Sequence, residues 1–482
     1  MNSSPDLGSE TSLKLDADRH LQQGVLSPLE TLAQSIAGIA PSATPGMLIP
    51  IVFGFAGNGA WLSYIIATVG IIFTARCINE FAGRFSCPGS LYTFTNDILG
   101  SRAGVLTGWA LMFAYVLCGA ACAVEFAIYV GSLSREFFGL SPWPALSIVV
   151  CILAVAYTGY KNIKLSATLM LRLEFLSIFL ILALVALAFG RFGFVDDGQL
   201  TCRGVGLENV RMGLVMAVFG FVGFESAASL GAEAKDPLVS IPRAILGSVI
   251  LTGFFFVFST YAMVTCFSHS HLDLAKCSTP LLEMSSILNA RYLGHLVDVG
   301  IMVSFFAACL ANLNAASRAL YKMSLDGLVH GHFSRSHRVN RTPFFAVFLC
   351  AALSLSIAAP LAMMNFAMLD IVGWLGTLAT FGYIFSYLTV SIGCARLLKR
   401  EAAVSSGAGA GVSSLANGGA RSTRMFLHMA MVPLSIIVLL FALVGSLYPL
   451  PAFPYNYLPY VFLAYMLVGL AFSFLTKSEE SL

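Results

Sequence analysis

The chain has 482 residues, of which 58% are hydrophobic and only 11% are charged, and its formal net charge is +3. Soluble domains carry about 25% charged residues, so this composition excludes a soluble protein and indicates an integral membrane protein surrounded by a lipid bilayer. The small net charge and the scattered basic residues argue against nucleic acid as a partner.

Residues 1–31 are polar, mixed in charge and without the apolar segment of a signal peptide, so we expect a cytosolic tail. Apolar stretches of about 20 residues, the length that crosses a bilayer, follow along the chain. We therefore predict an all-α integral membrane protein with about twelve transmembrane helices. The predicted spans run roughly over 32–55, 60–82, 104–132, 143–158, 169–189, 210–230, 241–267, 293–320, 344–361, 366–388, 426–447 and 458–475.

The connections between the spans differ in their content of Lys and Arg. Placing the N-terminus inside puts roughly three times as many basic residues in the inner connections, and basic residues favour the cytoplasmic side. We expect a multi-pass protein of the cell membrane, plasma or inner, with both termini cytoplasmic. Segment 191–209 is then an outer loop, and the Ser-, Gly- and Ala-rich segment 401–424 is a flexible cytosolic linker. The region 425–482 holds the last two helices and a short cytosolic C-terminus.

The first predicted helix contains a proline-rich interruption. Each proline removes a backbone donor and clashes with the preceding turn, which costs about 3 kcal/mol in a regular helix. A segment that only had to fill the bilayer would not carry two of them. The residues of this break are Pro41, Ser42, Ala43, Thr44, Pro45 and Gly46.

The sixth predicted helix is interrupted by glycines and a carboxylate. Gly220 and Gly223 each cost about 1 kcal/mol in a helix interior. Glu225 follows two residues later, and a carboxylate at membrane depth costs about 2.5–3.5 kcal/mol on insertion scales. Phe219 and Val222 flank the glycines. Either break alone is equally consistent with a simple kink, but the two lie at corresponding positions of two halves. Such pairs mark the binding sites of secondary transporters.

Several motifs resemble the amino acid–polyamine–organocation permeases. They are Gly223-Phe-Glu-Ser-Ala227, Gly231-Ala-Glu-Ala-Lys-Asp-Pro237, Ile241-Pro-Arg-Ala244, Arg84-Phe-Ser-Cys-Pro-Gly-Ser-Leu-Tyr92 and Ser317-Arg-Ala-Leu-Tyr-Lys-Met-Ser-Leu-Asp-Gly327. The resemblance implies a leucine-transporter-type fold, in which 32–190 and 210–400 form an inverted repeat of five helices each. Two further helices follow it. It also implies secondary transport of amino acids or small amines.

The two breaks are suited to the two poles of an amino acid. Backbone N–H groups and the helix dipole at Ser42–Gly46, with the hydroxyls of Ser42 and Thr44, would bind a carboxylate. Freed carbonyls around residues 219–222 would bind an ammonium group. The resemblance implies that Phe219 is an aromatic gate over the substrate, and a core phenylalanine is the alternative.

Four ionisable residues within the spans are further candidates. Glu225 either takes and releases a coupled proton or braces the break by accepting hydrogen bonds. Arg172 and Glu174, near the inner end of the fifth helix, are candidates for coupling, and Arg172 is alternatively an interfacial residue. Glu125, in the outer part of the third helix, is a candidate contact for the distal amine of a cationic substrate, or it is paired within the bundle.

The sequence therefore predicts a secondary active transporter that imports amino acids or related small amines by alternating access, coupled to protons. An amino acid or amine antiporter and a polyamine or cationic-substrate permease are the alternatives within this class. A membrane-embedded enzyme or a channel are the rivals outside it. No catalytic constellation, metal-ligand spacing or cofactor motif stands out, so we expect no cofactor.

Overall fold

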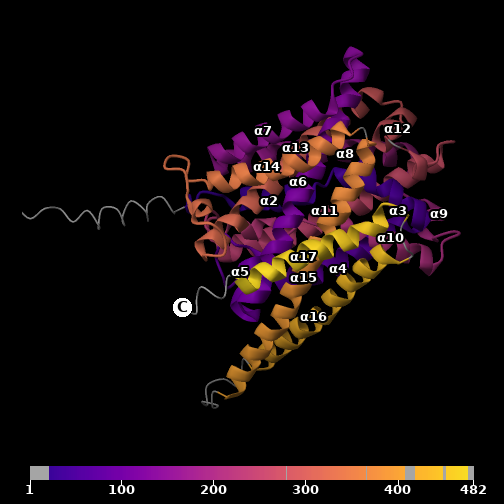
Figure 1. The fold of residues 1–482 in the computed structure, drawn as a ribbon. Helices are drawn as coiled ribbons and strands as arrows, with labels where there is room; N and C mark the ends of the chain where they lie inside the picture. The colour runs from indigo at the N-terminus through magenta and orange to yellow at the C-terminus, as the bar shows by residue number, and fades with distance from the viewer. Residues whose placement is uncertain (1–20, 278, 365, 408–417, 449–451, 476–482) are drawn as a thin grey trace, which may run out of the picture.

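The computed structural model describes residues 21–277, 279–364, 366–407, 418–448 and 452–475. These residues form a bundle of long helices with no β-strand beyond one isolated bridge, between Leu26 and Ala234 (Figure 1). Nine helical segments among them are long and apolar enough to cross a membrane. One of these, Pro28–Ala82, contains the first two predicted spans. The all-α membrane protein with many spans is confirmed.

The helices follow the predicted spans closely. Their bounds are α2 Pro28–Ile39, α3 Ile49–Ala56, α4 Ala60–Ala82, α5 Leu91–Leu99, α6 Ser101–Phe138, α7 Pro144–Lys161, α8 Ile163–Phe192, α9 Asp197–Leu200, α10 Leu207–Phe219, α11 Pro237–Ser268, α12 Pro280–Ile287, α13 Arg291–Leu325, α14 Phe344–Met363, α15 Met368–Gly407, α16 Gly418–Leu447 and α17 Leu458–Leu475. Two short segments, the π-helical η1 Thr44–Leu48 and the 3₁₀ helix η3 Ser226–Leu230, continue the first and sixth passages.

The ends of the helices follow from local sequence. Ser27 and Glu30 form a capping box at the start of α2, with Pro28 in the first turn, where its missing N–H costs nothing. The 38-residue α6 begins after Gly100 and ends at Gly139, whose φ of 65° is left-handed. A left-handed glycine is a common helix stop, because it carries no Cβ to clash.

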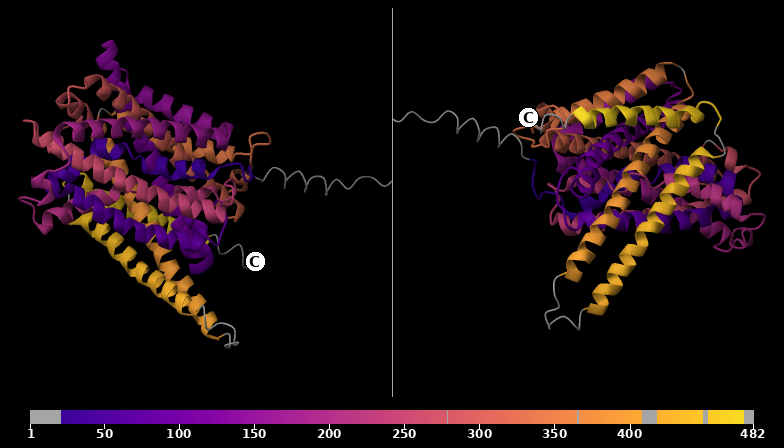
Figure 2. Two further views of the ribbon diagram at one scale, coloured as in Figure 1. Left: turned by 180° about the vertical axis from the view of Figure 1, so that it is seen from behind. Right: turned by 60° about the horizontal axis from the view of Figure 1, so that its bottom comes forward.

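The bundle is arranged around α6 and α13, whose apolar stretches have the largest share of buried residues among the nine membrane-crossing segments. The two helices pack along each other, and α2, α7, α8, α14 and α15 surround them. In Figure 2, α16 and α17 lie at the periphery, and α15 and α16 run side by side. The outer faces carry large exposed apolar side chains such as Phe175, Phe254 and Leu467, as expected for surfaces that meet lipid.

Two predicted boundaries need correction. The segment 401–424 is not an irregular linker throughout, because α15 continues to Gly407 and α16 begins at Gly418. Alanine is the best helix former, so Ala402 and Ala403 extend α15; residues 408–417 lie outside the described part. Helix α2 begins at Pro28, within the tail predicted over 1–31, and residues 1–20 are not described.

The two ends of the bundle differ. We call the end with the α4–α5 connection the α5 end and the opposite end, with the α8–α10 connection, the α9 end (Figure 1). At the α5 end, the backbone of Leu26 pairs with Glu233 and Lys235 on the connection that follows η3. The hydroxyl of Ser86 donates to the carbonyl of Gly231 at 2.7 Å. The N-terminal segment, the α4–α5 connection and the connection after η3 are therefore joined by hydrogen bonds at this end.

A fully buried ion pair adds to these contacts at the α5 end. The guanidinium of Arg318, on α13, donates to the carboxylate of Glu233 at 2.7 and 3.0 Å, and neither side chain is exposed. It also donates to the carbonyl of Asn314 at 3.0 Å. Removing one partner of a buried pair is strongly destabilising, because the remaining charge then has neither a partner nor water around it.

We predict that Arg318→Met lowers the free energy of unfolding by about 3–5 kcal/mol, since it leaves Glu233 buried without its cation. Thermal unfolding in detergent measures this as a lower Tm. Adding Glu233→Leu to Arg318→Met recovers part of the loss. The matched control is Arg211→Met, which removes a surface pair with Glu208 and leaves the Tm nearly unchanged. Equal losses in Arg318→Met and Arg211→Met would contradict the prediction.

Candidate functional site

The first passage is interrupted at the predicted prolines. Helix α2 ends at Ala40, whose φ of 53° is left-handed, and Pro41 follows directly. The chain then turns, with the amide of Ala43 donating to the carbonyl of Ala40 at 2.9 Å. Thr44–Leu48 form a single π-helical turn, η1, before α3 continues the passage. The break therefore covers all six residues that the sequence analysis selected.

The sixth passage is interrupted at the predicted glycines. Helix α10 ends at Phe219, residues 220–225 form successive turns, and the tight helix η3 follows. Gly223 has a φ of 90°, a conformation that side chains other than hydrogen rarely allow. Its amide donates to the hydroxyl of Tyr387 on α15 at 3.1 Å. Phe219 and Val222 are half-buried, whereas Phe221 and Phe224 are completely buried.

The two breaks touch each other. A Cβ on Gly38, in the last turns of α2, would lie 2.6 Å from the carbonyl oxygen of Gly223. The hydroxyl of Ser226 donates to the carbonyl of Gln34 at 2.9 Å, and the amide of Ala227 donates to the hydroxyl of Ser35 at 3.3 Å. The polar groups freed in one passage thus find partners in the other, which membrane interiors require of any irregular backbone.

One hydroxyl at the contact stays without a partner. The Oγ1 of Thr44 is buried and has no hydrogen-bond partner among the described residues. A Cβ placed on Gly220 would lie 3.0 Å from it, so this hydroxyl lies against the second break. An unpaired buried hydroxyl is unfavourable unless something binds it. The hydroxyl of Thr44 is therefore free to bond to a ligand between the breaks.

The carboxylate of Glu225 is held by hydrogen bonds from two tyrosine hydroxyls. The hydroxyl of Tyr115 on α6 donates to Oε1 at 2.8 Å, and the hydroxyl of Tyr387 donates to Oε2. Tyr387 already accepts the amide of Gly223, so its proton is directed to Glu225. The carboxylate therefore ties the second break to α6 and α15.

Glu174 and Arg172 point to different sides of α8. Glu174 is buried and accepts the hydroxyl of Ser304 on α13, at 2.9 Å to Oε1 and 3.0 Å to Oε2. One turn further, the hydroxyl of Ser177 bonds to that of Ser42 in the first break. Arg172 is exposed on the outer face of the helix. The structure thus brings Glu174 next to the first break but leaves Arg172 away from it.

Glu125 lies on α6, which passes both breaks. Tyr129, one turn further along α6, has its hydroxyl 3.1 Å from the position of a Cβ on Gly46. Glu125 itself is buried. Glu125 and Glu174 thus lie about one turn from Tyr129 and Ser177, the residues that contact the first break, whereas Arg172 lies away from it.

The sequence analysis missed several residues of this region, among them Gly38, Tyr115, Ser177 and Tyr387. A hydroxyl within an apolar span is the available signal for the last three. Their partners lie more than 100 residues away along the chain, so only the fold reveals the pairing.

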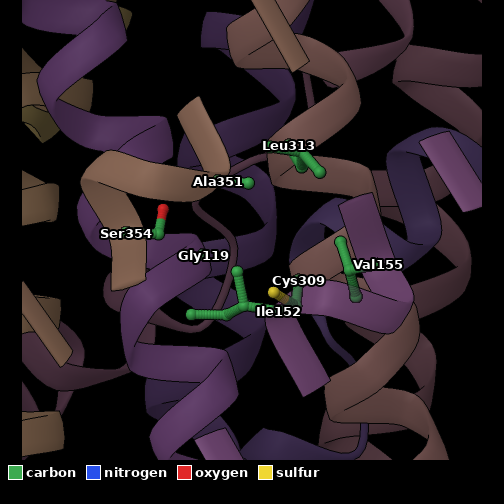
Figure 3. Close-up of a pocket in the computed structure, with 7 residues that line it drawn as sticks. All are labelled: Gly119, Ile152, Val155, Cys309, Leu313, Ala351 and Ser354. Atoms are coloured by element: carbon green, nitrogen blue, oxygen red, sulfur yellow. The ribbon is translucent and has the colours of Figure 1, made fainter. Parts of the chain in front are cut away.

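A separate cavity lies behind α6 (Figure 3). It has a volume of about 10 Å³ and lies between α6, α7, α13 and α14. It is lined by Gly119, Ile152, Val155, Cys309, Leu313, Ala351 and Ser354. This is space for about one water molecule, so the cavity is too small for an amino acid.

A bundle of apolar spans in which two broken helices meet is the architecture of membrane transporters. A family model described as amino acid permease matches residues 31–478, and the chain belongs to this family. The resemblance to the amino acid–polyamine–organocation permeases is thereby confirmed. Family and relatives indicate amino acid or amine transport by a multi-pass membrane protein and identify a transporter, not an enzyme.

The relatives are named for different substrates. The branched-chain amino acid permease BcaP of Bacillus subtilis is 25% identical over 338 residues, which cover 66% of this chain and 71% of the relative. The methylthioribose transporter of the same organism is 23% identical over 351 residues, or 68% of this chain and 72% of that protein. Cationic amino acid transporter 4 of Mus musculus is 25% identical over 352 residues, or 68% of this chain and 54% of that protein.

We predict that Gly38→Ala destabilises the protein by about 1–3 kcal/mol, because the added methyl group would overlap the backbone of the second break. The measurement is the Tm of the purified protein in detergent. Gly190→Ala on α8 is the matched control: its methyl group would meet nothing within 4 Å, and alanine favours the helix. Equal Tm values for Gly38→Ala and the unmodified protein would show that the two passages do not touch here.

Proposed function

We propose that the protein is a secondary active transporter that imports amino acids or related small amines by alternating access, coupled to protons. The observation that carries this proposal is the contact between the two breaks, with the unpaired Thr44 hydroxyl beside Gly220. The names of these relatives support amino acids as substrates. We place the protein in the cell membrane with both termini cytoplasmic, so that the α5 end faces the cytoplasm.

The site binds the two poles of an amino acid at the two breaks. The substrate carboxylate accepts from the hydroxyl of Thr44 and from the backbone N–H groups of Ser42 and Thr44, where the start of the helical continuation adds about half a positive charge. The amides of Ala43 and Gly46 already donate to the carbonyls of Ala40 and Ser42, and Pro45 has no N–H. The substrate ammonium donates to carbonyls at residues 219–222. Phe219 packs over the bound substrate. We propose an inverted repeat of 32–190 and 210–400 as the frame that moves around this site.

Alternating access requires one end to open while the other closes. The α5 end is closed by the Leu26 pairing and by the buried Arg318–Glu233 pair. Substrate therefore reaches the breaks from the α9 end, and release to the cytoplasm requires these contacts to separate.

Of the two carboxylates at the breaks, we assign the coupled proton to Glu174. Glu225 accepts hydrogen bonds from the hydroxyls of Tyr115 and Tyr387. The Tyr387 oxygen already accepts the amide of Gly223, so its proton points to Glu225. Among the described residues, Glu174 bonds to the hydroxyl of Ser304, which is able to donate to an ionised carboxylate or accept from a protonated one. Glu174 thus exchanges a proton without losing a partner, and Glu225 braces the break.

The test of the transport proposal is uptake into proteoliposomes. With an inwardly directed proton gradient, we expect saturable accumulation of at least one member of a panel of amino acids and amines, and collapse of this accumulation by a protonophore. Accumulation that depends on sodium and not on pH would overturn the coupling. Non-saturating flux with single-channel currents would show a channel instead.

Glu174→Gln tests the coupling residue. We expect it to abolish accumulation driven by the proton gradient and to preserve exchange of internal for external substrate, because Gln keeps a partner for Ser304 but cannot release a proton. Glu225→Gln is the comparison, and it is expected to lower both activities together because it loosens the second break. The reverse pattern would assign the proton to Glu225, and obligatory exchange in the unmodified protein would identify an antiporter.

A further inference from the structure

The last turns of α15 and the first turns of α16 project away from the rest of the bundle (Figure 2). Helix α15 has 40 residues, which corresponds to about 60 Å, whereas the hydrocarbon core of a bilayer is about 30 Å thick. We call residues 391–407 of α15 and 418–430 of α16 the α15–α16 hairpin. It lies at the α5 end, because Glu401 on α15 pairs with Arg84, which directly follows α4.

Three basic side chains share one exposed face of α15. Arg396, Lys399 and Arg400 are all exposed, and spacings of three and four residues place them on the same side of a helix. Leu397 and Leu398 are 8% and 3% exposed and belong to the core of the bundle, so they lie on the opposite side. Among the described residues, no ion pair joins any of the three basic side chains to an acid. We call these three residues the basic face.

The acid closest to the basic face along the chain is paired with a different helix. Between residues 391 and 448 the sequence has five Lys or Arg and a single acid, Glu401. Its two carboxylate oxygens lie 3.2 Å from Nε and Nη2 of Arg84. The positive charge of the basic face is therefore not neutralised within the hairpin.

The same side of α15 is apolar one turn before the basic face. Ile392 is 50% exposed and precedes Arg396 by four residues. An exposed apolar side chain followed by long basic ones is expected where a helix leaves the hydrocarbon and reaches the headgroups. The cytoplasmic leaflet is negatively charged at this depth and attracts basic segments next to membrane helices. Both the charge and the position of the basic face thus match an anionic headgroup.

We propose that the basic face binds the headgroups of anionic phospholipids in the cytoplasmic leaflet and holds the α15–α16 hairpin against the membrane surface. The inference goes beyond transport and rests on the proposed function only for the orientation, which places the α5 end in the cytoplasm. The headgroup phosphate accepts hydrogen bonds from the guanidinium and ammonium groups, which are charge-assisted and therefore strong.

The hairpin is joined to the candidate site through α15. The hydroxyl of Ser435 on α16 bonds to those of Thr74 on α4 and Ser391 on α15, each at 2.9 Å. Tyr387, one turn before Ser391, donates to Glu225 at the second break. A headgroup bound at the basic face therefore restrains the helix that holds this break.

Dioctanoyl phosphatidylglycerol and dioctanoyl phosphatidylcholine are the decisive probes, because they share their acyl chains and differ in headgroup charge. Calorimetric titration of the purified full-length protein in a non-ionic detergent measures both dissociation constants. We expect phosphatidylglycerol to bind at least about tenfold more tightly, since each basic side chain near an anionic surface contributes about fivefold. Raising the ionic strength is expected to reduce this ratio, because salt screens exposed charges.

The triple variant Arg396→Gln, Lys399→Gln, Arg400→Gln removes the charges of the basic face and keeps its side chains polar. We expect it to bring the ratio of the two dissociation constants close to one. If the triple variant does not fold, Lys399→Glu alone replaces it, and we expect this reversal of one charge to lower the ratio by at least about fivefold.

The matched control is the triple variant Arg135→Gln, Arg191→Gln, Arg203→Gln, which removes three exposed charges at the α9 end and should leave the ratio unchanged. An unchanged ratio in the α15 variant, or an equal loss in the control, would overturn the proposal. Binding of a polyglutamate peptide without a preference for phosphatidylglycerol would also overturn it and identify an acidic protein as the partner. Because binding is measured without transport, failure of all uptake would overturn the proposed function and leave this result unaffected.

Discussion

The close approach of Gly38 and Gly223 is the contact on which the candidate site depends. Neither position has room for a side chain, because each faces the backbone of the other passage. This proximity lets Ser226 reach the carbonyl of Gln34 and lets Ser35 accept the amide of Ala227. An irregular backbone in an apolar environment is stable only when its polar groups are satisfied within the protein. The two breaks therefore stabilise each other, and separating them would leave both unsatisfied.

The buried charged groups differ between the two ends of the bundle: they are paired at the α5 end and unpaired toward the α9 end. At the α5 end the charges are paired and the backbone of Leu26 joins the connection after η3, so this end is held by specific contacts. Toward the α9 end, Glu125 and Asp298 are buried without such partners. Paired charges resist separation, whereas unpaired acids favour the arrival of a cation. This difference is what a carrier needs if its substrate enters from the α9 end while the α5 end is closed.

The sequence predicted those features that depend on local chemistry. The spans follow from apolar length, and the two breaks follow from Pro41, Pro45, Gly220 and Gly223, since proline and glycine disturb a helix wherever they lie. Features that depend on the fold were out of reach. Gly38 has no local signal that another backbone approaches it, and the tyrosines that hold Glu225 come from distant helices.

Some features that the sequence left open have a simple geometric cause. Arg172 and Glu174 are two residues apart, so an α-helix directs them to opposite sides, and the sequence does not reveal which of the two sides is buried. The predicted linker 401–424 failed at both edges because composition describes a segment as a whole. Its alanines continue α15 even though Ser and Gly are abundant nearby. In both cases amino-acid composition alone does not determine the outcome, and the packing of the helices does.

Substrate charge and proton coupling are linked energetically. A membrane potential that is negative inside contributes about 2.3 kcal/mol per 100 mV to the import of one positive charge. The potential alone thus supports roughly fortyfold accumulation of a solute with a net charge of +1 at 100 mV, since 1.4 kcal/mol corresponds to a factor of ten. A zwitterion receives no such contribution, so under the proposed function its accumulation depends on the proton that we assign to Glu174.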